Sequence, residues 1–552
     1  KVSNASLNLN REFSIQNLTM EIRNIKSNEK KGFEIKINNG LVDGINLANS
    51  IINMTKEKEG LKVKSLMTTK GQINFSLIKK VQNIFSLNLN YLKDIKATVD
   101  FKTNIIFDID KIFRTKNLTY NIEGDLVYLN FKTKKSSIIK NFLPYYDPEF
   151  IFKDSKIKIS NSKSKVYSEL FGLIKTNNKF SEFKIKNSYN YKDKSFDINC
   201  FLDLTNSKIR ISKLNYKKDY NENSEVNFNI KFSPSKYYNI NNLNFLHKNT
   251  FINLSNIKLN KNFEINDLES VEIKTFKEKV KNNDFFIKNK KKLLISGDVF
   301  DAQPLLKSLY KKSDKNTFSK KFNREIEVNF NQVLTGTNDE LFDLAMIASI
   351  NNGSYNKLSL KGNFSKYEIV EMSIYQIDKD KKTLQVISDR ARPFIKNFEF
   401  IEGFEGGKLE YESTISKNVS NSNLLITDFK VSKVPALAKL LTLASLQGIA
   451  DTLGGEGIRF DSFEMKSNSQ GNVMNIEDAL AMGPAVSILL NGYVDKGKVV
   501  SIRGTLVPAT KLNSIIATIP VVGDILVGKK TGEGVVGVSF KMKGPPKDIK
   551  TT

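Results

Sequence analysis

Hydrophobic and polar positions alternate along most of the chain from Val2 to about Gly297, and the pattern recurs further on. Clear examples are Phe33–Asn38, Val226–Phe232 and Ile326–Asn331. Alternation places the apolar side chains of a strand on one face and the polar ones on the other. Short clusters of Asn, Asp, Ser and Lys separate these segments, as hairpin loops require. The pattern therefore predicts an antiparallel sheet with one apolar and one solvated face.

Helical patterns are few. A short helix is predicted over Asp301–Leu309, with Asp301 as its N-cap. A longer helix is predicted over Pro435–Leu453, because Pro suits its first turn and two glycines follow its end. A third helix is predicted over Lys511–Thr518, just before a proline. These helices are too few to cover the apolar face of a long sheet.

The apolar face must then pack on a second sheet or curl around an apolar guest. A globular sandwich stays open as an alternative. We expect a mainly β protein, in which an elongated, twisted antiparallel β-sheet forms an open hydrophobic groove, with a few short helices near the C-terminus. The candidate groove-lining residues are Phe33, Ile35, Ile37, Val226, Phe228, Ile230, Ile326, Val328 and Phe330.

The texture of the chain changes near residue 400, and we place domain boundaries near residues 290 and 400. Lys- and Asn-rich strands dominate before residue 400, and most glycines and small apolar residues follow it. We predict three regions. They are a repetitive β-sheet groove over 1–290, a middle β region with a short helix over 291–400, and a C-terminal module with an amphipathic helix over 401–552.

The chain has 552 residues and a net charge of +27, which raises the question of a polyanionic partner. Lysines are spread along the chain, and in the alternating segments they point away from the phenylalanines. Nucleic-acid binding needs basic and aromatic side chains on one surface, so no nucleic-acid partner is predicted. A weak attraction to anionic membrane surfaces is compatible with the charge. The sequence contains no run of about 18 apolar residues, so no membrane-spanning helix is predicted.

Residues suited to catalysis or metal binding are scarce. The single histidine, His247, lies in a Lys- and Asn-rich segment and is interpreted as a surface residue, and with Cys200 it cannot complete a zinc site. Asp108 and Asp110 share one strand face, where they could bind a cation, act as an acid–base pair, or simply face solvent, as we favour. A near phosphate-binding loop ends in Lys530 where Ser or Thr is required. We predict no enzyme activity, metal or cofactor.

The C-terminal part contains a specific series of motifs. In chain order they are Gly297–Ala302 with Pro304–Leu306, Phe404–Leu409, Asp428–Val431, Val434–Leu441, Ala444–Ile449, Gly455–Phe460, Gly504–Pro508, Leu512–Asn513 and Ile519–Gly528. The series resembles the AsmA-like C-terminal region of the YhdP-type envelope proteins, and it covers residues 290–545. The first 290 residues are similar to this family in texture only.

This resemblance implies a periplasmic, inner-membrane-anchored protein of the cell envelope with a repeating β-groove fold. It implies phospholipid transport towards the outer membrane, in support of the outer-membrane barrier, by a bacterial relative of the bridge-like lipid transfer proteins. The family brings no catalytic residues. Its N-terminal membrane helix and the Asn-Pro segment after its final strand are missing, and the chain begins at Lys1, so we expect both ends to be truncated.

The predicted helix over Pro435–Leu453 is apolar nearly all round, and it is read either as a plug in the groove or as a tip that contacts the receiving membrane. Its candidate contact residues are Leu437, Leu440, Leu441, Leu446 and Ile449. Two alternatives to a lipid conduit stay open. The protein could be a structural or assembly factor for outer-membrane components that acts by protein–protein contacts, or an autotransporter-like surface protein.

Overall fold

The computed structural model describes most of the chain in two compact units. Unit 1 comprises Lys1–Ser212 and Tyr216–Phe263, and unit 2 comprises Lys213–Asn215 and Glu264–Thr552. The described residues are 1–8, 13–26, 31–85, 92–133, 140, 142–176, 179–234, 236–309, 317–378, 380–395, 403–416, 419–432, 457–495, 498–508, 538–545 and 548–552.

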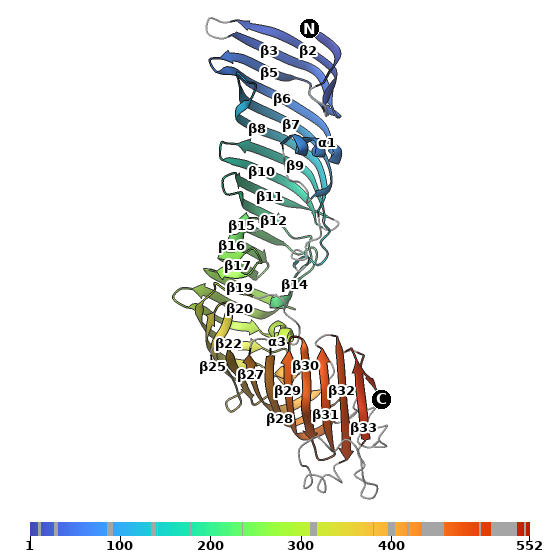
Figure 1. Ribbon diagram of the computed structural model, residues 1–552, viewed down its shortest axis with the longest axis vertical. Coiled ribbons are helices and arrows are strands. Elements are labelled where there is room, and N and C mark those ends of the chain that lie inside the picture. Colours follow the sequence, from blue (N-terminus) through green and yellow to red (C-terminus); the bar gives the residue numbers. More distant parts are fainter. Residues whose placement is uncertain are drawn as a thin grey trace. The chain divides into compact units, whose positions relative to one another are not determined.

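Unit 1 is one sheet whose successive strands pair antiparallel, and Figure 1 shows them following one another in chain order from blue to green. A small separate hairpin, β13–β14, lies in the loop between β12 and β15. The elements are β1 (Val2–Asn8), β2 (Ser14–Lys26), β3 (Lys31–Val42), β4 (Ile45–Asn46), β5 (Ser50–Glu57), β6 (Gly60–Asn74), α1 (Phe75–Phe85), β7 (Leu92–Asp110), β8 (Thr115–Thr133), β9 (Glu149–Asn161), β10 (Lys165–Thr176), β11 (Lys179–Asn190), β12 (Ser195–Asp203), β13 (Ile209–Ile211), β14 (Tyr216–Lys218), β15 (Ser224–Ser233), β16 (Tyr237–His247) and β17 (Thr250–Asn260), with a 3-10 turn at Ser212–Leu214.

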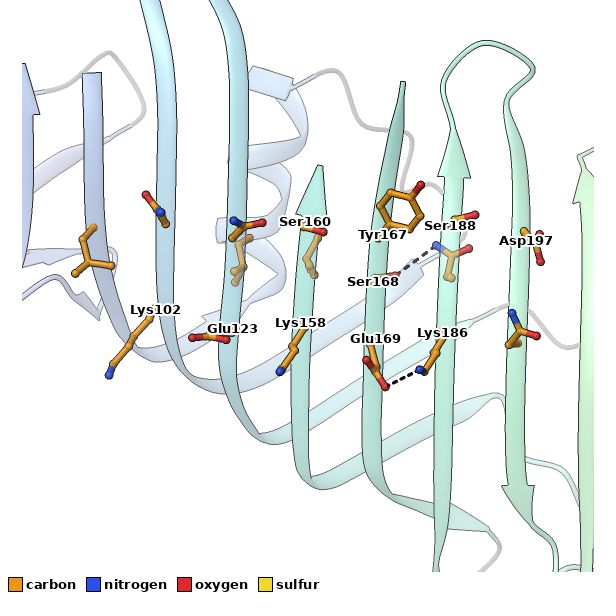
Figure 2. A pocket seen from close by; sticks show the side chains of 17 residues that line it. Lys102, Glu123, Lys158, Ser160, Tyr167, Ser168, Glu169, Lys186, Ser188 and Asp197 are labelled. Carbon is orange, nitrogen blue, oxygen red and sulfur yellow. Dashed lines mark hydrogen bonds and ion pairs between the residues drawn. The ribbon is translucent and has the colours of Figure 1, made fainter. Parts of the chain in front are cut away.

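The long strands of unit 1 bend rather than run flat, as Figure 2 shows. One cause is a bulge, where Thr98 faces Tyr128 but Val99 faces Leu126, so that β8 carries one extra residue. A second is Gly124, whose φ of 153° is open to glycine and to few other residues. A Cβ at this position would lie 2.1 Å from the carbonyl oxygen of Asp100. The bend therefore depends on the absence of a side chain here.

Helix α1 covers the apolar face at the N-terminal end of unit 1. It begins after Asn74, whose side-chain oxygen accepts a hydrogen bond from the Leu77 amide at 3.0 Å, as an N-cap does. Leu77 then packs in a buried cluster with Leu18 and Ile37. The sequence did not predict this helix.

Unit 2 is also built on antiparallel pairings of successive strands, with one parallel step. Its elements are β18 (Ile265–Asp267), β19 (Ser270–Lys277), β20 (Val280–Asn289), β21 (Leu293–Asp301), α3 (Gln303–Leu309), β22 (Arg324–Leu334), β23 (Leu341–Asn351), β24 (Ser354–Asn363), β25 (Ile369–Asp378), β26 (Lys381–Ser388), α4 (Arg392–Ile395), β27 (Phe404–Ser416), β28 (Val419–Val431), β29 (Ile458–Gln470), β30 (Val473–Met482), β31 (Val486–Asp495), β32 (Val499–Pro508), β33 (Val538–Gly544) and β34 (Lys550–Thr551).

The parallel step joins β21 to β22 through α3. The helix predicted here is present but starts later than expected. Ala302 accepts the first helical hydrogen bond, from the Leu306 amide at 2.9 Å, so Ala302 rather than Asp301 holds the N-cap position. Asp301 lies one residue earlier and accepts a hydrogen bond from the Gln303 amide at 3.1 Å.

The core of unit 2 lies under one face of β26–β33. Phe404, Phe429 and Phe460 stack in sequence across β27, β28 and β29, with ring centroids 5.2 and 5.3 Å apart. Ala391, just before α4, and Ile395, the last residue of α4, are buried in the same cluster. The core-facing side of β26–β33 is therefore filled by the protein's own side chains.

Asp339 clamps three loops of unit 2. This buried carboxylate accepts hydrogen bonds from Arg390 at 2.9 Å and Arg392 at 2.6 Å, and Arg390 also binds Glu368 at 2.6 Å. Burial acts to raise the pKa of Asp339, but the two guanidinium groups outweigh it and hold the pKa below its ordinary value.

Asp339→Asn is expected to lower the free energy of unfolding by roughly 3 kcal/mol, because it leaves two arginines without their buried partner. The depressed pKa means that the carboxylate stabilises the fold above pH 3.8, its unfolded value, and that this contribution fades as the pH falls through the folded pKa. Urea unfolding at pH 7 and at pH 3 tests this. A variant as acid-sensitive as the wild type would contradict it.

The predicted fold class is confirmed, since both units are mainly β and built from many antiparallel strands. The two units divide at Phe263 and Glu264, whereas the sequence suggested boundaries near 290 and 400. The helices predicted over Pro435–Leu453 and Lys511–Thr518 lie outside the described residues, together with the contact residues Leu437, Leu440, Leu441, Leu446 and Ile449. Within the described part of the chain, no helix has both the length and the apolar composition to cross a membrane.

Candidate functional site: the apolar face of unit 1

Five neighbouring strands of unit 1 carry apolar side chains in matching register. The strands are β11, β12, β15, β16 and β17, and the alternation brings one face of each to the same side of the sheet. Four rows cross them, each written from β11 to β17: Phe183, Leu202, Val226, Phe245 and Ile252; Ile185, Cys200, Phe228, Leu243 and Leu254; Asn187, Ile198, Ile230, Ile240 and Ile257; and Tyr189, Phe196, Phe232, Tyr238 and Leu259. Asn187 alone is polar, so the face is almost continuously apolar.

The first of these rows is the most buried, with Leu202 and Val226 partly exposed, and the others are more open. Tyr216 of β14 is fully buried, with its ring centroid 6.0 Å from that of Phe245 in an edge-on contact, and so shields this border of the face. Most side chains of the other three rows, including Phe228 and Ile230, are partly exposed. Helix α1 packs on β6 and β7, nearer the N-terminus. Part of the apolar face thus remains accessible.

Aromatic rings line the outer border of this face. Tyr189 and Phe196 lie 4.7 Å apart, Phe196 and Phe232 5.2 Å, Phe232 and Tyr238 5.8 Å, and Tyr238 and Phe263 4.5 Å, all between ring centroids. Such pairs add about 0.5–1.5 kcal/mol each beyond the area that they bury. The strip combines apolar ring surface with the hydroxyl groups of Tyr189 and Tyr238.

The opposite face of the same sheet is polar. Lys102, Glu123, Lys158, Glu169 and Lys186 form a row of alternating charge across β7–β11, seen in Figure 2. An open depression of about 820 Å³ lies on this face, lined mostly by charged, amide and hydroxyl side chains. A hydrogen bond from Lys184 is the main cause that lowers the pKa of Glu169. The charged, amide and hydroxyl groups of this depression can bind a polar ligand.

The first predicted lining set grades from exposed to buried along β3. Phe33 is exposed, Ile35 is partly exposed, and Ile37 is buried in the cluster under α1. Only the outer part of this set is accessible.

The other two predicted sets differ from each other. Val226, Phe228 and Ile230 lie in the first three of the four rows, all partly exposed. Ile326, Val328 and Phe330 are buried in unit 2. There Phe330 stacks on Phe300 at 5.2 Å, so the protein's own residues fill the space beside it.

His247 is buried, so its interpretation as a surface residue was wrong. Its Nδ1 lies 2.7 Å from the Tyr216 hydroxyl and its Nε2 lies 3.3 Å from the Glu222 carboxylate. Burial lowers the pKa of His247 and is also the main cause that raises the pKa of Tyr216. The pair joins the loop after β12 to β16 and thereby holds Tyr216 over the apolar face.

Lys218 holds the same loop from inside. Its side chain is 2% exposed, and its ammonium group donates to the carbonyl oxygens of Leu204, Thr205, Ser207 and Asp219 at 2.9–3.1 Å. Burial lowers the pKa of Lys218 to about 8.

Stability is expected to rise with pH between about 8, the folded pKa of Lys218, and 10.5, its unfolded value. In this window the unfolded chain binds a proton that the folded chain has released, so alkalinity favours folding at this site. Urea midpoints at pH 7.5 and 9.5 for wild type and Lys218→Met measure it. The urea midpoint of the wild type, relative to that of Lys218→Met, should be higher at pH 9.5 than at pH 7.5. An unchanged difference between the two midpoints would argue against the assignment.

Cys200 lies in the second row. It is buried, and burial raises the pKa of its thiol to about 12, so the group acts as an apolar side chain. Asp108 and Asp110 are both engaged by neighbours. Asn117 donates to Asp108 at 2.8 Å, and Arg114 and Lys116 each lie 3.0 Å from Asp110. The part of the chain that the structure describes has no group of three or more His, Cys, Asp or Glu able to hold a metal ion.

No protein-family model matches this chain, and no curated protein matches it either.

Sequence reasoning predicted the lining residues of β15, which are Val226, Phe228 and Ile230, and missed those of the neighbouring strands. The alternation of Phe183 and Ile185 with lysines was visible, but which residues of β12, β16 and β17 stand beside them depends on strand register. The aromatic border could have been suspected from Tyr189, Phe196 and Phe232, each at the end of an alternating segment. The role of Tyr216 carried no signal in the sequence.

Proposed function

We propose that this protein is a non-enzymatic lipid carrier of the bacterial cell envelope, which holds phospholipid acyl chains on the apolar face of unit 1. The supporting observation is the set of four matched apolar rows across β11–β17, most of them partly exposed. An accessible apolar face of this extent is typical of a binding surface.

The energetics of such a face favour long apolar guests. Five strands at a spacing of ~4.8 Å extend over roughly 19 Å, which is on the scale of a lipid tail. Each methylene group moved from water onto an apolar surface gains about 0.8 kcal/mol. Because the rows contain almost no polar group, no single position binds much more tightly than the next. A bound acyl chain can therefore move along the face without being trapped at one tightly binding position.

The transport role and the location rest on further support. The resemblance of residues 290–545 to AsmA-like envelope proteins favours a periplasmic protein, anchored in the inner membrane, that carries phospholipid between the inner and outer membranes. The net charge of +27 favours attraction to anionic headgroups near those membranes. Contact with the outer membrane belongs to the same proposal.

Lipid extraction from the purified protein, followed by mass spectrometry, tests the proposal. We expect phospholipid to co-purify at one or more molecules per chain. A protein that purifies free of lipid and takes up none from labelled vesicles would overturn the proposal and favour an assembly factor that acts through protein contacts.

A further inference from the structure

The turn between β7 and β8 presents two large apolar side chains to solvent. Ile112 is 65% exposed and Phe113 is 85% exposed, the highest value for a large apolar side chain among the described residues. Isolated exposed apolar residues are common, but two adjacent ones at the tip of a long hairpin form a compact protrusion.

The backbone of this turn is held in place by Asp110. Its side-chain Oδ1 accepts hydrogen bonds from the amides of Ile112 at 3.1 Å and Arg114 at 2.9 Å, and its carbonyl oxygen accepts one from Phe113 at 2.9 Å. Phe113 has a φ of 61°, a conformation that favours glycine or asparagine. A bulky ring in a strained and largely solvated position contributes little to the packing of unit 1. The strain points to a use for the ring outside the fold.

Basic side chains surround the two apolar ones. Lys111, Arg114 and Lys116 flank the tip, and the side chains of Arg114 and Lys116 are more than half exposed. Asp110 neutralises one of these three charges. Asp108 and Lys62, which face each other across the neighbouring strands, balance one another. Three cations less one carboxylate leave Asp110–Lys116 with a net charge of +2, and the adjacent turn of Glu57, Lys58 and Glu59 lowers the net charge of this end of the sheet to +1.

We propose that this tip, Lys111–Lys116, docks on an anionic lipid bilayer, inserting Ile112 and Phe113 among the headgroups while the basic side chains bind phosphates. Two apolar side chains bury far less than the ~1,000 Å² that a stable protein interface requires. Shallow insertion combined with electrostatic attraction is enough for reversible membrane contact. This inference does not depend on lipid binding by the four rows, because it concerns the bilayer surface and a different part of unit 1.

The absence of tryptophan from the sequence allows a direct test with the whole chain. Phe113→Trp introduces a single reporter at the tip. On addition of vesicles that contain phosphatidylglycerol, its emission is expected to shift to shorter wavelength and to be quenched by brominated lipid. Tyr367→Trp is the matched control, since Tyr367 is 83% exposed on a turn of unit 2, and its emission should not change.

A loss-of-binding pair completes the test. Ile112→Ser with Phe113→Ser should reduce vesicle flotation by about tenfold or more, from the lost apolar burial. Tyr367→Ser with Ile377→Ser removes two side chains of similar exposure and should leave flotation unchanged. Salt should weaken wild-type binding, and neutral vesicles should bind poorly. If anionic vesicles do not shift the emission of the Phe113→Trp protein, or if the tip variant floats like wild type, the proposal is overturned, and the first result would favour a protein partner.

Discussion

Protein carrying Phe228→Asp together with Leu243→Asp is expected to lose nearly all of its bound phospholipid. The two side chains face each other across β15 and β16 in the second apolar row, and both are partly exposed. Two carboxylates there would have to lose their hydration beside an acyl chain, or force the chain away from the surface. We expect apparent lipid affinity to fall by at least about a hundredfold.

The chain offers a close control for this experiment. Asn227 and Asn244 face each other on the same two strands, one residue along, and point to the polar face. Asn227→Asp with Asn244→Asp adds the same two charges and should retain the lipid. Phospholipid content by mass spectrometry and the urea midpoint should be measured for both proteins. Equal lipid content in the two folded variants would exclude the four rows as the binding surface.

Gly124→Ala is expected to destabilise unit 1 by about 3–5 kcal/mol. The backbone at Gly124 lies in a region that few other residues enter, and the added Cβ would meet the carbonyl oxygen of Asp100 at 2.1 Å. The strand cannot relax easily, because Gly124 pairs with Phe101 on one side and Ile157 on the other. The cost therefore combines backbone strain with a clash between two paired strands.

Gly44→Ala separates these two causes. Gly44 also has a positive φ, of 84°, but a Cβ there would meet no atom within 4 Å. It should cost only about 1 kcal/mol, from strain alone. Chemical denaturation of both variants gives the comparison. Equal losses at the two positions would show that the bend does not depend on close contact at Gly124.

The alternation of apolar and polar residues was enough to predict the strands and their two faces, because this alternation does not depend on how the strands pair in the sheet. Register was not predictable in the same way. The extra residue in β8 near Val127 shifts every later pairing of that strand, yet the alternation continues on both sides of it. The sequence could also not show that Phe330 would be closed off by Phe300, or that β3 would run from an exposed Phe33 to a buried Ile37.

The error at His247 has a similar origin. A histidine among Lys and Asn residues has the local character of a surface position. Its burial comes from Tyr216, which lies 31 residues earlier in the chain and returns over the sheet through a loop. The buried Lys218 in that loop was equally hidden, because its four acceptors are backbone carbonyls that any sequence provides. Such contacts follow from the tertiary path of the chain.

The parallel step from β21 through α3 to β22 bears on how a sheet of this kind can change in length. In a meander, the gain or loss of one hairpin leaves every later turn on its original edge, whereas the gain of a single strand would transfer all of them to the other edge. A helical crossover removes that restriction, because the strand after it runs in the same direction as the strand before it. Duplication could therefore add whole hairpins on either side of α3, whereas the gain or loss of a single strand is accommodated at α3 itself.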